Sequence, residues 1–365
     1  MTRLRSDKSL IIIAGILLVY GLVVLSSAGI IEGQKKFDSP QYYLIHQIQN
    51  GIIPGLILFL VFSRIKYKFW QKFAVPIFLL SISFLVLLFL PAFGTALKGA
   101  QRWLRLAFFS FQPSEILKLS SIIYFASWFS RHEIKNNHWS YSVAPFFVVL
   151  GFISLLLILQ PDVGTLSIII LISLSIYFSA GAKIKHLVIL GLIITIVFGA
   201  LIYIEPYRFN RVLAFLNPSF DIEGGSYHIR QAILGIGNGG IFGLGFGRSQ
   251  QKINFLPEPV GDSIFVILTE ELGLVGAGFL IIMFLMLAIK LIQIAKSSPD
   301  NFSQLFVIGV LSWIVGQAVM NISAVSGLIP LTGVPLPFLS YGGTAMASIL
   351  GALGIVNNIT KYSRQ

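Results

Sequence analysis

Long apolar runs with few charges dominate this 365-residue sequence. A helix that crosses the hydrocarbon core of a bilayer needs about 20 mainly apolar residues. Runs of that kind lie at approximately 10–31, 44–62, 73–92, 114–130, 143–160, 164–180, 186–204, 263–289, 302–326 and 338–359. The sequence therefore predicts an all-α, polytopic integral membrane protein with about ten transmembrane helices.

The scarcity of charge also favours lipid as the main solvent. Only 11% of the residues are charged, whereas a soluble domain carries about 25%. The net charge of +12 sits in short loops between apolar runs, which indicates contact with membrane lipid and no nucleic acid. The chain has no cysteine, and its histidines are scattered, so we predict no metal site.

The distribution of lysine and arginine predicts the orientation. With the N-terminus in the cytoplasm, the inside segments hold fifteen basic residues, and the short outside loops hold five: Lys35, Lys36, Lys98, Arg102 and Arg105. Cytoplasmic loops are normally the basic ones. An even number of helices returns the C-terminus to the cytoplasm, so we predict a multi-pass protein of the cytoplasmic (inner) membrane.

One long segment without a membrane span remains, from about 205 to 262. In this topology it is an extracytoplasmic loop between helices seven and eight of a single domain, 1–365. Loops of this length within compact proteins are usually functional. Its run Gly235-Ile-Gly-Asn-Gly-Gly240 matches the dinucleotide-binding spelling, but the βαβ context is missing, so we exclude a dinucleotide site.

A pair of opposite charges opens the fourth predicted helix, in Gln112-Pro-Ser-Glu-Ile-Leu-Lys118. Glu115 and Lys118 are three residues apart, so they share one helix face. Charges at membrane depth are costly and are functional candidates by default. The alternative is a salt bridge that only sets the topology.

Other carboxylates lie at predicted helix starts. We predict that Asp162 is a helix cap rather than a catalytic residue. Asp262 lies where the long loop re-enters the membrane, and it could serve both as a cap and in a chemical role. Further along that helix, at least one of Glu270 and Glu271 must face a polar interior, because exposing both to lipid would be costly.

The segment Leu331-Thr-Gly-Val-Pro-Leu-Pro-Phe-Leu-Ser-Tyr-Gly-Gly-Thr344 contains two prolines that forbid a regular helix. We predict that Ser340 and Tyr341 line a polar cavity.

Five blocks occur in order along the chain: KGAQRWL, QPSEILKL, LQPDVGT, the loop from YRFNRVLAFLNP to LPEPVGD, and TGVPLPFLSYGG. Together they resemble the SEDS family (shape, elongation, division and sporulation proteins) over nearly all ten predicted spans. The run from Gly243 to Glu258 is more similar to the division branch, FtsW, than to the elongation branch, RodA.

This resemblance implies a glycosyltransferase that polymerises lipid II outside the membrane for septal wall synthesis. It also implies a class B penicillin-binding protein as transpeptidase partner, beside other division or elongation proteins. The catalytic carboxylate would fall on Asp262 and the polar pair on Glu115 and Lys118. Where the family often has Thr-Asp-Phe, this chain has Gly261-Asp262-Ser263, so the packing around the aspartate differs.

The implied reaction is inverting hexosyl transfer, in which the acceptor sugar's 4-hydroxyl attacks the donor and undecaprenyl pyrophosphate leaves. Asp262 is the candidate base. The candidate cations for the pyrophosphate are Arg102, Arg208, Arg211 and Lys118. A divalent cation such as Mg or Mn could share that work, although no carboxylate cluster demands one.

Three alternatives stay open. A lipid II flippase would use embedded charges as a polar path, but we find no paired repeats with broken helices. A non-enzymatic scaffold would need more cytoplasmic surface than the short loops offer. An elongation-type, RodA-like polymerase would act in cell-shape maintenance.

Overall fold

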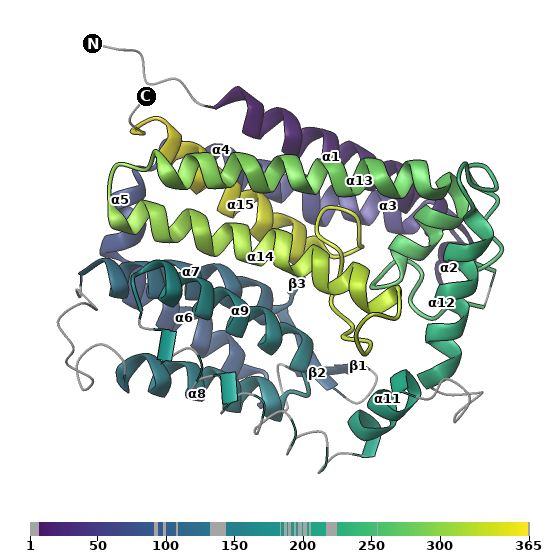
Figure 1. Cartoon of the computed structure of the whole chain (residues 1–365), viewed down its shortest axis with the longest axis horizontal. Helices are drawn as coiled ribbons and strands as arrows, with labels where there is room; N and C mark the ends of the chain where they lie inside the picture. Colours follow the sequence, from purple (N-terminus) through teal and green to yellow (C-terminus); the bar gives the residue numbers. More distant parts are fainter. Residues whose placement is uncertain are drawn as a thin grey trace.

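The computed structural model describes residues 7–90, 94–97, 100–106, 109–131, 144–182, 206–216, 225–253 and 255–363, with isolated positions between 184 and 203. Its long helices α1, α13 and α14, whose bounds follow, run along the long axis of the molecule (Figure 1). Most of the seventh predicted span, 186–204, lies outside the described residues.

Five helical segments are long and apolar enough to cross a membrane. They are α1 (Lys8–Ala28), the segment Tyr42–Arg64 made of α3 (Tyr42–Gln47), η1 (Ile48–Ile52) and α4 (Ile53–Arg64), α13 (Ile264–Lys296), α14 (Asn301–Val325) and α15 (Gly343–Thr360). The other helices on predicted spans are α6 (Ala74–Leu87), α7 (Pro113–Arg131), α8 (Ala144–Leu159) and α9 (Val163–Ser179). These elements confirm the helical, polytopic architecture.

The outward faces of the helices are apolar. Ile12, Val19, Ile57, Leu79 and Ile282 are each more than half exposed, whereas a soluble protein rarely exposes extensive apolar surface. Polar and charged side chains gather inside instead. This inverted distribution is what a hydrocarbon solvent demands.

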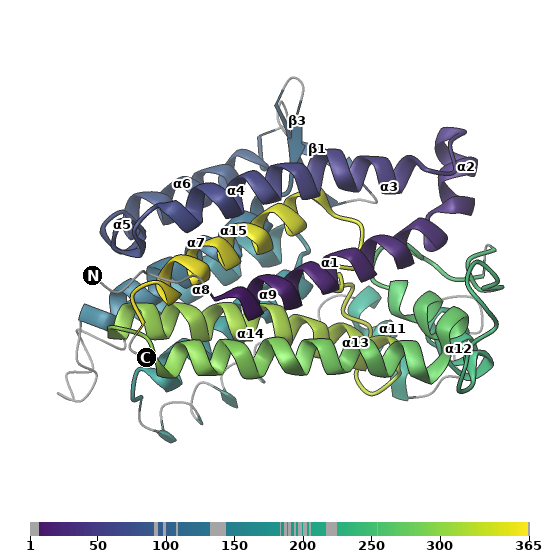
Figure 2. The same ribbon diagram turned by 90° about the horizontal axis from the view of Figure 1, so that it is seen from above.

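Both ends of the chain lie at one end of the bundle (Figures 1 and 2). The Asp7 N–H donates to Thr360 Oγ1 (3.3 Å), and the Asp7 carboxylate pairs with Lys290 (2.7 Å). At the same end, Asp300 pairs with Lys68 of α5 (Tyr67–Lys72) at 2.6 Å. The loops predicted to be cytoplasmic thus come together, which agrees with an even number of crossings between the termini.

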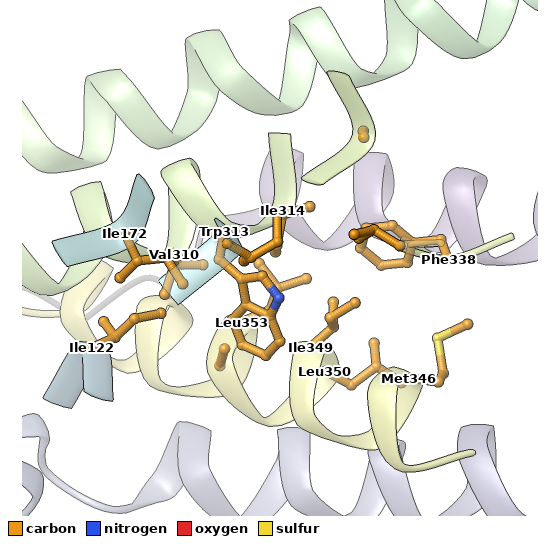
Figure 3. Packing of buried hydrophobic residues seen from close by; sticks show 14 of the residues in the cluster. Ile122, Ile172, Val310, Trp313, Ile314, Phe338, Met346, Ile349, Leu350 and Leu353 are labelled. Atoms are coloured by element: carbon orange, nitrogen blue, oxygen red, sulfur yellow. The ribbon is translucent and has the colours of Figure 1, made fainter. Parts of the chain in front are cut away.

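The core between α7, α9, α14 and α15 is filled by branched aliphatic side chains around Trp313 (Figure 3). Trp313 of α14 is fully buried and lies near Leu353 of α15 (Figure 3). Membrane helices gain stability chiefly from such close packing, because lipid tails are as apolar as leucine.

Glycines bring α4 and α15 into backbone contact. A Cβ on Gly354 would lie 2.7 Å from the Phe59 carbonyl oxygen, and a Cβ on Gly55 would lie 3.2 Å from the Ala347 Cα. Small residues at helix interfaces allow this approach. These two helices therefore form a tightly packed pair.

A small antiparallel sheet lies between α6 and α7. Within the described ranges it consists of β1 (Gly94–Leu97), β2 (Ala100–Leu106) and β3 (Phe109–Phe111), in the order β1-β2-β3. It projects from one side of the bundle (Figure 2). The all-α expectation did not include this sheet, because strands this short carry little periodic signal.

The long segment predicted between helices seven and eight has helices of its own in its described part. They are α11 (Pro206–Leu216) and α12 (Gly225–Gly239). Both lie at the end of the bundle opposite the chain termini (Figure 1). An irregular stretch, described at 240–253 and 255–263, then leads to α13.

The helix α13 is interrupted at Gly273, whose φ of 64° and ψ of −164° are not helical. Backbone hydrogen bonds from the irregular stretch compensate for this break in the helix. The Leu244 N–H donates to the Glu270 carbonyl (3.0 Å), and the Leu274 N–H donates to the Gly240 carbonyl (2.9 Å). Buried backbone groups must be paired, so segment 240–245 replaces the helical bonds that the break removes.

The last helix begins later than its apolar run suggests. It starts at Gly343 rather than at 338, because Pro335, Pro337 and the left-handed φ of 68° at Phe338 keep the preceding segment irregular. Segment 331–342 thereby remains available to build a site.

Candidate functional site

The backbone around Asp262 is held in place by hydrogen bonds that three of its successive carbonyl groups accept. The Val260 carbonyl accepts from the Tyr341 N–H (2.8 Å), the Gly261 carbonyl from the Ser340 hydroxyl (2.7 Å), and the Asp262 carbonyl from the Asn321 side-chain amide (2.7 Å). The donors belong to segment 331–342 and to α14. The position of Asp262 is therefore set by contacts distant in sequence.

The Asp262 side chain is half-buried, and its two oxygens lie in different surroundings. Oδ1 is 3.3 Å from the Ser263 hydroxyl. Oδ2 faces Gly333, where a Cβ would lie 3.8 Å away. Gly333 therefore brings no side chain up against Oδ2.

Segment 331–342 is in turn anchored by one face of α14. Gln317 Nε2 donates to the Pro335 carbonyl (2.7 Å), and Asn321 Nδ2 donates to the Val334 carbonyl (2.7 Å). Gln317 and Asn321 are four residues apart, so they share a helix face. This face of α14 therefore connects the segment to the interior of the bundle.

The Glu115–Lys118 pair lies at the other end of this connection. The two charges are 2.8 Å apart, and both side chains are at most 3% exposed. Lys118 Nζ also donates to Gln317 Oε1 (3.0 Å) and lies over the Trp313 ring, 5.2 Å from its centroid. Lys118 is thus enclosed by partners from α7 and α14.

Asp162 caps α9, as its sequence position suggests. Its Oδ1 accepts from the Thr165 N–H (3.2 Å), and its Oδ2 accepts from the Ser114 hydroxyl (3.3 Å). A Cβ on Gly164 would lie 2.9 Å from the Thr332 carbonyl oxygen. The start of α9 therefore packs against the same segment that borders Asp262.

The predicted arginines are only partly described. Arg102 of β2 donates through Nη2 to the Pro161 carbonyl, which attaches the sheet to the start of α9. Arg208 and Arg211 lie on α11, but their side chains lie outside the described residues. Arg102 is thus the one of the three whose surroundings are known: it borders the turn beside the site.

Ser340 and Tyr341 shape the site mainly through hydrogen bonds. The Ser340 hydroxyl is engaged twice, since it also accepts from the Leu336 N–H (2.7 Å). The Tyr341 ring packs edge-on against Tyr43, with 5.0 Å between centroids. Both residues therefore brace the segment that holds Asp262.

A second buried charge cluster joins α1, the irregular stretch and α13. Glu271 pairs with Lys252 (2.7 Å) and accepts from Ser27 (2.7 Å), while Glu270 accepts from the Gln251 N–H (3.1 Å). Both glutamates are almost fully buried, which confirms their predicted polar surroundings. The role of Lys252 was missed, because nothing in its local sequence distinguishes it from a loop lysine.

Among the described residues, no group of three or more His, Cys, Asp or Glu side chains could hold a metal ion. The site consists of a carboxylate at the end of a helical bundle, braced by buried amides and hydroxyls. Such an arrangement suits proton abstraction from a hydroxyl.

Comparisons with known proteins agree over the whole chain. Stage V sporulation protein E of Bacillus subtilis (strain 168) is 36% identical over 358 residues, which cover 98% of both chains. The probable peptidoglycan glycosyltransferase FtsW of Geobacter sulfurreducens (strain DL-1 / KN400) is 35% identical over 356 residues, covering 98% of this chain and 95% of that relative.

The fold agrees as well. A chain in the structure of a peptidoglycan synthase complex superposes with a TM-score of 0.81 at 24% identity, and the match covers 99% of each chain. The model of the FtsW/RodA/SpoVE family, described as cell cycle protein, matches residues 7–365. This chain is therefore a multi-pass membrane protein of the FtsW/RodA/SpoVE family, the SEDS family that its sequence blocks resemble.

Proposed function

We propose that this chain is a peptidoglycan glycosyltransferase that polymerises lipid II into glycan strands at the outer face of the cytoplasmic membrane. The relatives include a probable peptidoglycan glycosyltransferase and a sporulation protein, which supports septal wall synthesis. The observation that carries the proposal is Asp262, a half-buried carboxylate whose own carbonyl accepts a hydrogen bond from Asn321, while the preceding carbonyl, that of Gly261, accepts one from Ser340.

In the proposed reaction, Asp262 takes the proton of the acceptor sugar's 4-hydroxyl as that oxygen attacks the donor's anomeric carbon. The bond to undecaprenyl pyrophosphate breaks, and the configuration inverts. Oδ2 suits this task because it faces Gly333. A positioned base of this kind contributes about 10²- to 10⁴-fold to a rate.

The leaving pyrophosphate needs positive charge. Arg102, Arg208 and Arg211 are the proposed contacts, because a guanidinium binds phosphate oxygens in a bidentate manner. Arg102 already lies beside the turn before α9, which packs against the segment 331–342 that borders Asp262. A divalent cation such as Mg or Mn, if it takes part, would arrive with the pyrophosphate.

The proposed orientation in the membrane follows from the excess of lysine and arginine in the loops assigned to the cytoplasm. The sheet, α11, α12 and segment 331–342 lie outside the cell, and both termini lie in the cytoplasm. The family resemblance and the fold of a chain in a peptidoglycan synthase complex support a class B penicillin-binding protein as partner. That partner would cross-link the strands as they emerge.

The test is polymerisation by purified protein with lipid II and the partner transpeptidase. We expect Asp262→Asn to lose at least about 100-fold in rate, while the control Asp38→Asn, at an exposed carboxylate, keeps wild-type activity. A folded Asp262→Asn protein that polymerises at the wild-type rate would remove Asp262 from the base role. A wild-type protein that moves lipid II across vesicles without forming polymer would instead support the flippase alternative.

A further inference from the structure

An imidazole contacts the residue next to Asp262. His228 Nε2, on α12, lies 2.7 Å from the Ser263 hydroxyl oxygen. The same hydroxyl is 2.9 Å from the Pro257 carbonyl oxygen and 3.3 Å from Asp262 Oδ1. Ser263 is fully buried, while His228 and Asp262 are half-buried. One hydroxyl therefore links the imidazole to the proposed base.

The number of protons decides how this link works. A serine hydroxyl donates one hydrogen bond at a time, and neither the Pro257 carbonyl nor an ionised Asp262 can donate. Ser263 can donate to either of these two acceptors, one at a time, only if it accepts from His228, which places a proton on His228 Nε2. The opposite tautomer would take the serine proton for itself.

The position of Ser263 in its helix supports a role beyond capping. Ser263 is the N-cap residue of α13, yet its side chain makes no cap hydrogen bond. An N-cap serine normally accepts from the backbone N–H of the second or third helical residue. Here the hydroxyl faces His228 and Asp262 instead.

We propose that His228 is a positioning residue that acts on Asp262 through Ser263. The relay holds Oδ1 and thereby keeps Oδ2 directed towards Gly333, the side from which the acceptor hydroxyl would approach. This inference rests on the proposed function. It requires no change in the protonation of His228 during turnover, because a neutral ring with its proton on Nε2 donates as well as a charged one.

The expected effect is on turnover rather than on substrate binding. The hydrogen bond to a charged carboxylate that the relay supplies corresponds to about a tenfold change in rate. We therefore expect His228→Leu and Ser263→Ala each to lower kcat about tenfold, with KM unchanged because neither side chain contacts the substrate.

The decisive measurement is a double-mutant cycle in the polymerisation assay. If His228 acts only through Ser263, the double variant His228→Leu/Ser263→Ala loses no more activity than Ser263→Ala alone. His228→Gln, whose amide can donate to the hydroxyl, should recover most of the kcat. The control Ser167→Ala removes a local hydrogen bond on α9 and should leave kcat unchanged.

Fully additive losses, or wild-type kcat in both single variants, would overturn the relay. Wild-type and Asp262→Asn proteins are assayed in parallel to separate the two proposals. A wild-type protein that forms no polymer overturns both. An inactive Asp262→Asn beside fully active His228→Leu and Ser263→Ala overturns the relay alone. If His228→Leu does not fold, Ser263→Ala and His228→Gln decide, since both are small changes.

Discussion

The side-chain amide of Asn321 donates to the backbone carbonyl of Asp262, with an N···O distance of 2.7 Å. The same amide donates to the Val334 carbonyl at 2.7 Å. Asn321 is buried on α14, so a rigid helix holds both the start of α13 and the proline-containing segment. The position of the proposed base thus depends on a residue that touches no substrate.

We expect Asn321→Ala to displace Asp262. Losing the amide leaves two carbonyls without their donor, which costs about 1–3 kcal/mol for each buried group. The rate of polymerisation should fall at least about tenfold, because small misplacements of a catalytic group are expensive. Asn301→Ala, at an exposed position of the same helix, is the matched control. Equal rates for the two variants would contradict this role of Asn321.

Removing one partner of the buried Glu115–Lys118 pair should be strongly destabilising. Lys118→Met leaves Glu115 buried without its counter-charge, at a cost of about 3–5 kcal/mol. The double variant Glu115→Gln/Lys118→Met should recover most of that loss in thermal unfolding. Lys36→Met breaks an exposed pair with Glu32 and should cost less than about 1 kcal/mol. A double variant as unstable as Lys118→Met would refute the charge explanation.

The break in α13 requires glycine. A Cβ on Gly273 would lie 2.4 Å from the Gly243 nitrogen and 2.4 Å from the Ile241 carbonyl oxygen. We expect Gly273→Ala to cost about 3 kcal/mol through strain and overlap, measured by thermal unfolding. Gly278→Ala, on the same helix with nothing within 4 Å, should be neutral or slightly stabilising. Similar unfolding temperatures for the two variants would show that the break tolerates a side chain.

Acid should weaken the end of the bundle near Asp300. Burial raises the pKa of Asp300, but Lys68 and the Ser303 N–H lower it more, so its pKa lies below the ordinary value. A depressed pKa contributes stability that is present above the ordinary value of about 3.9 and is lost as pH falls through the folded value. As the pH falls below about 4, the unfolding temperature of the wild-type protein should therefore drop. It should drop less in Asp300→Asn, which lacks the titrating carboxyl group. The same acid dependence in both proteins would contradict the prediction.

Two interactions near the site could be predicted from the spacing of residues along the sequence. The pairing of Glu115 with Lys118 follows from a three-residue separation on one helix. The capping role of Asp162 follows from its place before a helix. In both cases the interacting groups are neighbours in the chain, so backbone geometry alone brings them together.

The remaining contacts depend on how distant segments pack. Lys252 pairs with Glu271 only because the irregular stretch packs against the break in α13 and hydrogen-bonds to it. His228 reaches Ser263 because α12 lies against the start of α13. The short sheet and the late start of α15 escaped prediction for a related reason: strands of a few residues and proline-containing turns give weak periodic signals.

The sequence by itself determined that this chain crosses a membrane many times and which apolar runs form most of its helices. It also determined where acidic side chains lie at helix starts. Those properties depend on hydrophobicity and on helix periodicity, which are local. Only the tertiary structure decided which carbonyls hold Asp262 and which residues surround its two oxygens. Those contacts join residues as far apart as Gly261 and Ser340, and their formation depends on the complementary packing of helices, which no local pattern encodes.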